Sequence, residues 1–173
     1  NANPNGADVT FDAATWTYLQ NNNLLHNGSS GEYRLNQYRA GTSAGPNTVT
    51  FDAGEGNTIA TGGGSDIHGS FHDTDTFAQS GELNFGSGNN LIGNRSGTSS
   101  NFHISGADVN FNRADNNSGQ SVRVGAGGGD GTSMLELTGG SLGTRRGALI
   151  NETGVFNVQG SDPGEVAIGG PGS

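Results

Sequence analysis

A single short phrase recurs along the chain and limits the folds that the chain can adopt. Each copy has a Gly, Asn, Ser or Thr turn, a strand in which apolar residues alternate with small or polar ones, and a second turn. One such unit cannot bury its apolar face alone, so the copies must pack on one another in a stack. The pattern therefore predicts an all-β protein built from stacked units. The copies are residues 6–13, 47–53, 81–86, 106–112, 133–139 and 153–160.

Composition indicates how thick the core of such a stack can be. Gly accounts for 33 of the 173 residues, and residues with hydrophobic side chains make up 29%. This composition argues against a thick conventional core. The Val, Leu, Ile and Phe residues nevertheless fall in regular groups, which can form a thin continuous core. We therefore expect an ordered chain that forms one structural domain.

Two β architectures fit the alternation of strand and turn that continues from about Asn47. One is a β-solenoid (β-helix), in which successive strands wind round one axis. The other is an antiparallel β-sandwich. Glycine clusters such as Gly62–Gly64 and Gly139–Gly140 suit the tight bends between the faces of a solenoid. We prefer the solenoid and keep the sandwich as the alternative.

Residues 1–45 differ from the repeats in residues 46–173, because they contain many of the large side chains. The one Trp and all three Tyr of the chain lie there. Residues 13–25 have the length of a short helix, although Thr15, Thr17 and a run of Asn residues weaken its propensity. We expect an N-terminal strand and a cap, formed by a short helix or an irregular hairpin, that protects the open end of the stack.

Three segments in the second half of the chain have a sequence pattern similar to that of a known group of repeat proteins. They read Leu135-Glu-Leu-Thr-Gly-Gly-Ser-Leu-Gly, Gly154-Val-Phe-Asn-Val-Gln-Gly and Glu165-Val-Ala-Ile-Gly-Gly. Over roughly residues 106–170, this pattern resembles the repeats of secreted bacterial β-solenoid repeat proteins of the autotransporter-passenger and PEP-CTERM-sorted type. The resemblance implies a right-handed parallel β-helix that lies at a cell surface or in an extracellular matrix.

The charge balance limits the partners of the chain. Sixteen Asp and Glu residues against seven Arg give a formal net charge of −9. Nucleic acid and anionic membranes repel such a surface, and no apolar run approaches the length of a membrane span, so we expect neither as a partner. The chain has no Cys and therefore no disulfide. A start at Asn1 and a polar composition fit an extracellular or cell-surface protein whose leader has been removed.

One cluster of residues has the chemistry of a metal site. On a single strand its first three members would point the same way, with the last two on the following turn. Imidazole and carboxylate groups suit Zn²⁺, although two His without a third fixed ligand make a weak signal and a solvated polar loop is the simpler interpretation. The cluster comprises Asp66, His68, His72, Asp73 and Asp75.

A calcium site has less support from the sequence. Residues 125–132 resemble one degraded copy of a Gly-Gly-x-Gly-x-Asp repeat. Tandem copies of that repeat share each Ca²⁺ ion, so a single copy is better explained as a tight glycine turn. A divalent cation, Ca²⁺ or Zn²⁺, is thus a hypothesis, and no other cofactor is expected.

The repeated wording favours a structural function. Gly6-Ala-Asp-Val-Thr-Phe11 nearly repeats Gly106-Ala-Asp-Val-Asn-Phe111. Through Val9 and Phe11, the first strand could thus take the place of an internal strand in a neighbouring subunit. This indicates an extracellular filament or biofilm-matrix subunit that polymerises with itself, head to tail, through edge-strand pairing. Two ordinary strands of one monomer explain the phrase equally well.

Two other functions remain open. A cell-surface adhesin or carbohydrate-binding module would use an aromatic platform, although packing of the cap explains the same aromatic residues more simply. A polysaccharide-active enzyme ranks third, because the chain has no nucleophile elbow, phosphate loop or metalloprotease motif, and no catalytic residue is assigned. The platform would comprise Trp16, Tyr18, Tyr33 and Tyr38.

Four sequons would permit N-glycosylation in a suitable host. They are close to the number that chance produces in a chain so rich in Asn, Ser and Thr. The acceptor residues are Asn27, Asn94, Asn116 and Asn151.

Overall fold

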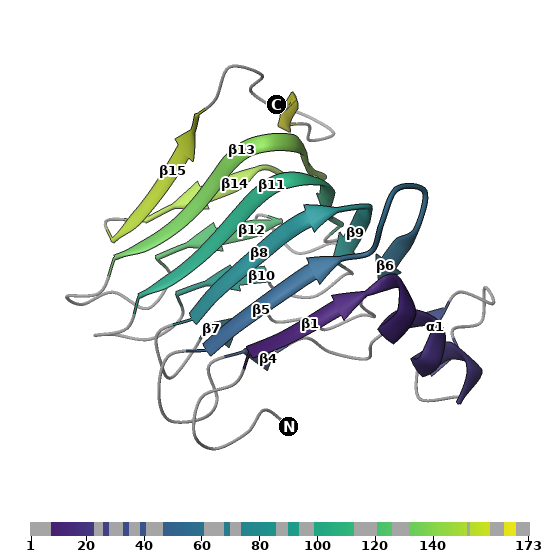
Figure 1. Cartoon of the computed structure of the whole chain (residues 1–173). Coiled ribbons are helices and arrows are strands. Elements are labelled where there is room, and N and C mark those ends of the chain that lie inside the picture. The colour runs from purple at the N-terminus through teal and green to yellow at the C-terminus, as the bar shows by residue number, and fades with distance from the viewer. Residues whose placement is uncertain are drawn as a thin grey trace.

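The computed structural model of the chain consists mostly of strands, so the all-β class is confirmed (Figure 1). It describes residues 8–22, 26–27, 33–34, 39–40, 47–60, 68–69, 74–85, 90–93, 99–112, 121–125, 132–151, 153–159 and 165–168. One α-helix, α1, spans Ala13–Asn21 in this part of the chain. The strands are β1 (Asp8–Asp12), β2 (His26–Asn27), β3 (Tyr33–Arg34), β4 (Arg39–Ala40), β5 (Asn47–Asp52), β6 (Thr58–Ala60), β7 (His68–Gly69), β8 (Thr74–Ser80), β9 (Glu82–Phe85), β10 (Asn90–Ile92), β11 (Ser100–Phe111), β12 (Val122–Val124), β13 (Ser133–Thr144), β14 (Ala148–Ile150), β15 (Gly154–Val158) and β16 (Glu165–Ile168).

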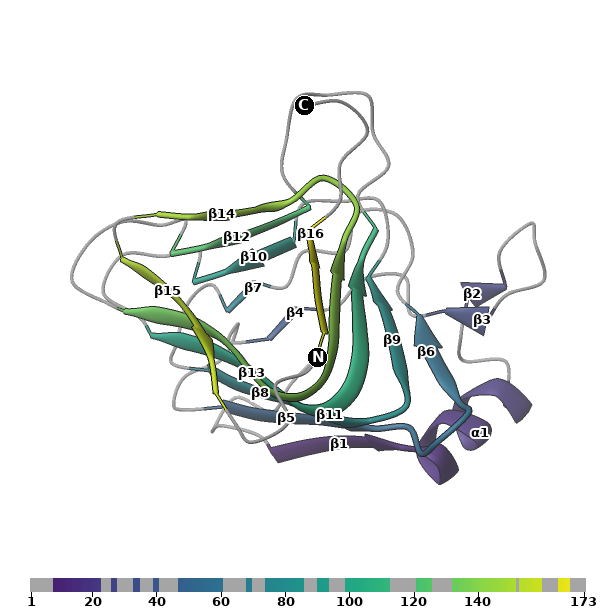
Figure 2. The ribbon, with the colours of Figure 1, turned by 90° about the horizontal axis from the view of Figure 1, so that it is seen from above.

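Nine strands form one parallel sheet that has two arms. The front arm runs in the order β1-β5-β8-β11-β13-β15. The side arm consists of β6, β9, the second halves of β11 and β13, and β16. A separate back sheet, β10-β12-β14, is also parallel. Seen from above, the two arms and the back sheet lie on three sides of a common interior (Figure 2).

Parallel pairing excludes one of the two architectures that the sequence left open. Among the described strands, only the two-residue strands β2 and β3 pair antiparallel, while β4 and β7 form a short parallel pair. Parallel strands need a long connection between them, unlike the hairpins of an antiparallel sheet. The antiparallel β-sandwich is therefore not the arrangement of this chain.

Strands β11 and β13 turn the corner between the two arms, and each has 12 residues. Register shifts between Ile104 and Asp108 mark this corner in their pairing. Gly140 lies at the same corner with a φ of +76°, and a Cβ atom there would lie 2.2 Å from the backbone oxygen of Ala107. Only glycine adopts this conformation without strain and leaves that space free. The sequence therefore located this bend correctly at Gly139–Gly140.

In-register stacking arranges the core of the front arm in straight rows. Members of both rows on internal strands are buried, with at most 7% of each side chain exposed. Burial of these rows supplies a continuous hydrophobic core, although each strand contributes few side chains. The first inner row is Val9, Val49, Thr76, Phe102, Leu135 and Phe156. The second inner row is Phe11, Phe51, Ala78, Ile104, Leu137 and Val158.

Helix α1 covers part of the N-terminal end of the stack. Asp12 precedes the helix and accepts a hydrogen bond of 2.7 Å from the backbone N–H of Thr15, which is an N-cap arrangement. This bond from the backbone of Thr15 lowers the pKa of the Asp12 carboxyl. Trp16 is 6% exposed and joins the core, with Leu19 packed against it. The short helix expected in residues 13–25 is therefore present and contributes to the core.

Candidate functional site

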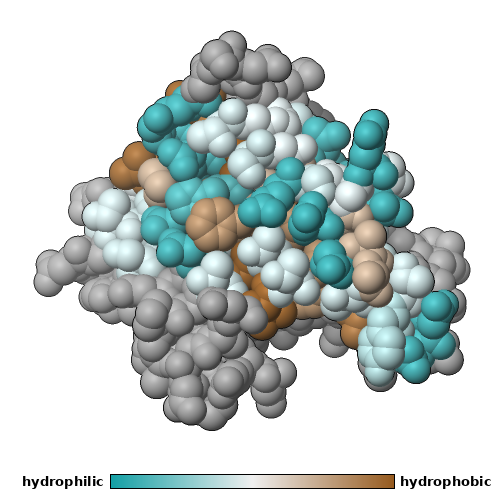
Figure 3. Space-filling view, in the orientation of Figure 1, coloured by the Kyte–Doolittle hydropathy of each residue, from teal (hydrophilic) through white to brown (hydrophobic). Residues whose placement is uncertain are grey.

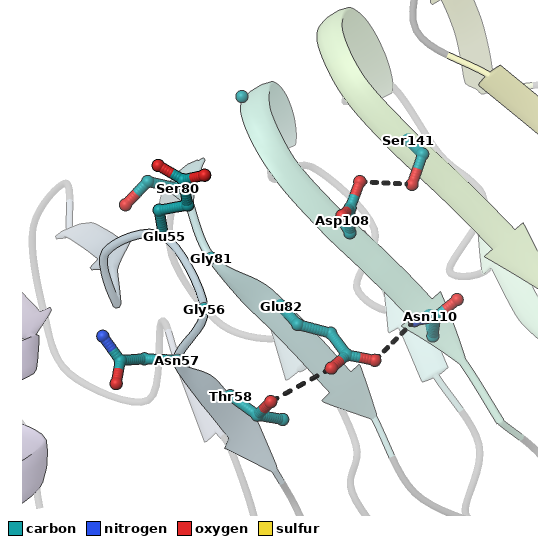
Figure 4. Close-up of a pocket in the computed structure, with 11 residues that line it drawn as sticks. Glu55, Gly56, Asn57, Thr58, Ser80, Gly81, Glu82, Asp108, Asn110 and Ser141 are labelled. Carbon is teal, nitrogen blue, oxygen red and sulfur yellow. Dashed lines mark hydrogen bonds between the residues drawn. The ribbon is translucent and has the colours of Figure 1, made fainter.

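An open groove of about 550 Å³ lies along the side arm, next to the corner with the front arm (Figure 4). Its lining consists of polar side chains and glycines, three of them carboxylates, and contains no basic residue. The polar lining comes from the turn after β5 and from β6, β8, β9, β11 and β13. The residues used below are Thr58, Glu82, Asp108, Asn110 and Ser141.

Strand register brings four of these residues into one row across the groove. Thr58, Glu82, Asp108 and Ser141 pair in sequence from β6 to β13. Glu82 accepts hydrogen bonds from the Thr58 hydroxyl at 3.0 Å and from the Asn110 amide at 3.4 Å. Asp108 accepts one from the Ser141 hydroxyl at 2.6 Å. Figure 4 shows these side chains lying along the groove floor, held by the dashed hydrogen bonds.

These contacts determine what the groove can bind. The hydroxyl and amide donors are engaged by the carboxylates, whereas each carboxylate oxygen keeps a further lone pair. The groove is therefore rich in acceptors that are already oriented, and it suits a ligand that presents hydroxyl donors. The sequence signal for these residues is the alternation along β9 and β11, which turns polar side chains away from the core, but only the pairing of separate strands places them side by side.

The second surface feature is the open C-terminal end of the stack. Three of the four exposed large hydrophobic residues in the described part of the chain lie there: Ile150 on β14 is 37% exposed, and Val155 and Val158 on β15 are each 42% exposed. The fourth is Tyr18 on α1. Val158 ends the second inner row, whose internal members are buried. Ile150 ends an equivalent back-sheet row in which Val124 is buried. Hydrophobic atoms reach the surface at the upper left of Figure 3, where Figure 1 shows β15.

The N-terminal strand, which carries the expected assembly residues Val9 and Phe11, pairs with a strand of its own chain. β1 pairs in parallel with β5, and the identical phrases Val-Thr-Phe-Asp of the two strands stand opposite each other in register. The ring of Phe11 stacks on that of Phe51 at 5.3 Å. Among the described strands β1 has a neighbour on one side only, so its other edge is open.

The metal hypothesis finds no support in the described part of the chain. Asp66, His72 and Asp73 lie outside the described residues, and the described strands there are β7 (His68–Gly69) and β8, which starts at Thr74. The expected turn at Asp75 was wrong, because Asp75 lies in β8 of the front arm, whereas His68 pairs with Arg39 of β4. Within the described ranges no group of three or more His, Asp or Glu side chains is placed to hold a metal ion.

Asp75 instead belongs to a polar cluster that the sequence did not reveal. His103 on β11 hydrogen-bonds through Nδ1 to Glu136 on β13 at 2.7 Å, and its Nε2 lies 3.9 Å from Asp75 Oδ1. The His103 ring also stacks on Phe77 at 4.8 Å. Asn101 donates to Asp75 at 2.9 Å. The cluster links three neighbouring strands of the front arm on their outward face.

The proposed aromatic platform is not formed as a unit. Trp16 is buried in the core, while Tyr18 is 61% exposed on α1. The two differ because α1 turns one face toward the interior and the other toward solvent. Tyr33 lies in β3, and Tyr38 is outside the described residues.

Two sequons fall within the described residues. Asn27 lies in β2, and Asn151 follows β14 with partial exposure. Asn151 sits in a turn, where its N–H donates to the Val124 oxygen and its oxygen accepts from the Gly154 N–H. Asn94 and Asn116 lie outside the described residues.

None of the helices in the described ranges has the length and apolar character to cross a membrane. No protein-family model, curated protein or solved structure matches the chain.

Proposed function

We propose that the chain is a β-solenoid subunit of an extracellular filament or of a cell-surface or biofilm matrix, assembled head to tail through edge-strand pairing. The observation that carries this proposal is the exposure of inward-facing apolar residues at the end of the stack. Val158 is 42% exposed at a row position where Ile104 and Leu137 are completely buried. The right-handed solenoid and the extracellular location come from the resemblance of the repeats to secreted bacterial β-solenoids.

An open strand edge combined with apolar side chains favours association. The edge presents unpaired backbone N–H and C=O groups, which another strand can satisfy. A contact between opposite ends of identical subunits is heterologous and does not close, so it propagates into a filament. Both described end strands of the front arm, β1 and β15, have such an edge.

Electron microscopy with size-exclusion chromatography tests the proposal. We expect regular fibres from the purified chain, and a Val158→Asp variant should remain folded but lose them, because the new charge lies in the contact. Tyr18→Asp is the matched control, since Tyr18 is also exposed but lies on α1. A monodisperse monomer at high concentration would contradict the filament. Loss of fibres on chelation would revive the divalent-cation hypothesis for residues 66–75.

The groove supports a second candidate function, which is binding of a polysaccharide by an adhesin or carbohydrate-binding module. Its polar row from Thr58 to Ser141, in which Glu82 and Asp108 are the oriented acceptors, runs across strands that are about 4.8 Å apart. This spacing is close to the length of one pyranose residue in an extended glycan. The carboxylates of the groove disfavour an anionic polysaccharide, so a neutral one is expected.

Calorimetry with soluble neutral polysaccharides tests this candidate. Glu82→Gln and Asp108→Asn should each weaken binding about tenfold, which corresponds to about 1.4 kcal/mol. Glu136→Gln is the control, because Glu136 belongs to the His103 cluster on the front arm. Equal affinity of all three variants and the native chain would exclude the groove as the binding site.

A further inference from the structure

We infer that strand β15 of one subunit pairs in parallel with strand β1 of the next, in the register that continues the rows of the front arm. The inference rests on the proposed head-to-tail assembly and specifies its contact. It places Phe156 opposite Val9 and Val158 opposite Phe11.

The continuity of the rows leads to this register. From β1 to β15, the first inner row passes through six strands, all of them parallel, and the second inner row does the same. Shifting a neighbouring strand by one residue would turn its apolar side chains to the outer face. A register that keeps the rows straight is therefore the one that covers Val158, which is now 42% exposed.

Strand β1 already makes a parallel, in-register contact with another strand of its own chain, β5. Among the described strands its outward edge has no neighbour, while its inward edge pairs with β5 in five consecutive register pairs, from Asp8 opposite Thr48 to Asp12 opposite Asp52. β15 likewise makes five consecutive pairs with β13, as many as β1 makes with β5. The two edge strands therefore match in length and, through the common direction of the front arm, in orientation.

The outward positions are compatible with the same register. Val155 would stand opposite Asp8, and Asn157 opposite Thr10. The second pair can form a side-chain hydrogen bond across the contact. No like-charged pair arises at these positions, because the described part of β15 carries no charged side chain.

Helix α1 limits where the next subunit can dock. The helix follows β1 directly and lies beside the start of the side arm in both views (Figures 1 and 2). Trp16 covers the core at that place. The contact is therefore confined to the front arm, with β1 as its outermost strand.

Cysteine cross-linking tests this register, and the chain has no Cys of its own. The double variant Thr10→Cys with Asn157→Cys places two thiols at one predicted pair. Adjacent strands lie about 4.8 Å apart, which is within the Cα separation of disulfides. Within one chain the same residues lie five strand steps apart, about 24 Å. Any disulfide at this pair must therefore join two subunits.

Under mild oxidation we expect a ladder of covalent oligomers from this variant. The control is Thr10→Cys with Gln159→Cys, because Gln159 is exposed two residues beyond the predicted partner and should give no ladder. Fibres that give no ladder, or equal ladders from both double variants, would contradict the register but not the proposed filament. Loss of fibres from the native chain would instead overturn the proposed function itself.

Discussion

Truncation of Phe85 tests the packing of the core most directly. Phe85 is 1% exposed, stacks on Phe111 at a centroid distance of 5.1 Å, and meets Phe51 and Phe102 edge to face at 6.3 and 5.9 Å. A buried Phe→Ala change costs about 3 to 5 kcal/mol through lost burial and the cavity that remains. Because three ring contacts are lost together, each worth about 0.5 to 1.5 kcal/mol, we expect a loss near the top of that range.

A second substitution separates burial from ring contacts. Phe85→Leu keeps an apolar side chain in the same space but removes the aromatic pairs. We expect it to lower the free energy of unfolding by about 1.5 kcal/mol, well below the cost of Phe85→Ala. Tyr18→Ala is the control, since this residue is 61% exposed and should change stability by less than about 0.5 kcal/mol.

Urea unfolding followed by far-ultraviolet circular dichroism provides the measurement. Trp16 is the one Trp of the chain and is buried at the N-terminal end, so its fluorescence reports the same transition from a second place. Coincident transitions indicate cooperative unfolding of the whole stack. A loss of less than about 1 kcal/mol for Phe85→Ala, or equal losses for Ala and Leu, would refute the reasoning from aromatic packing.

Three further substitutions test other parts of the fold. Asp12→Ala should lower the melting temperature at neutral pH, because the N-cap bond to Thr15 is lost. Since folding lowers the pKa of Asp12, this stabilisation is present above about pH 4 and disappears as the pH falls through the pKa of the folded state. Asp12→Asn should show no such pH dependence. Thr144→Val should leave stability unchanged or raise it by up to about 1 kcal/mol in urea unfolding, because the buried Thr144 hydroxyl has no hydrogen-bond partner among the described residues. A loss of stability above that size would contradict this. Gly140→Ala should lower the free energy of unfolding by about 2 kcal/mol or more, because its Cβ would collide with a backbone oxygen of β11. Gly56 has a similar φ of +75° but open space around it, so Gly56→Ala isolates the smaller conformational cost. Equal losses from the two variants would exclude the collision.

Local sequence pattern was sufficient to identify the strands and the class of fold. Alternation with a period of two is a property of each strand on its own, so phrases such as residues 47–53 and 106–112 could be recognised without their neighbours. The bend at Gly139–Gly140 and the short helix at the N-terminal end were likewise predictable from residues close in sequence. The same local reasoning failed at Asp75, which was expected on a turn but lies in β8.

Only the tertiary structure decided which strands are neighbours, and with them the groove and the His103 cluster. Asp8 pairs with Thr48, whereas Ser133 pairs with Gly154, so the length of chain between neighbours differs widely along the stack. The entropic cost of closing a loop rises slowly with its length, and the sequence therefore contains no local signal that selects one spacing. The sequence by itself determined which side chains point inward and which point outward. The row that brings Glu82 beside Asp108 exists only once separate strands pack in register, because that register is selected by the burial of the whole core.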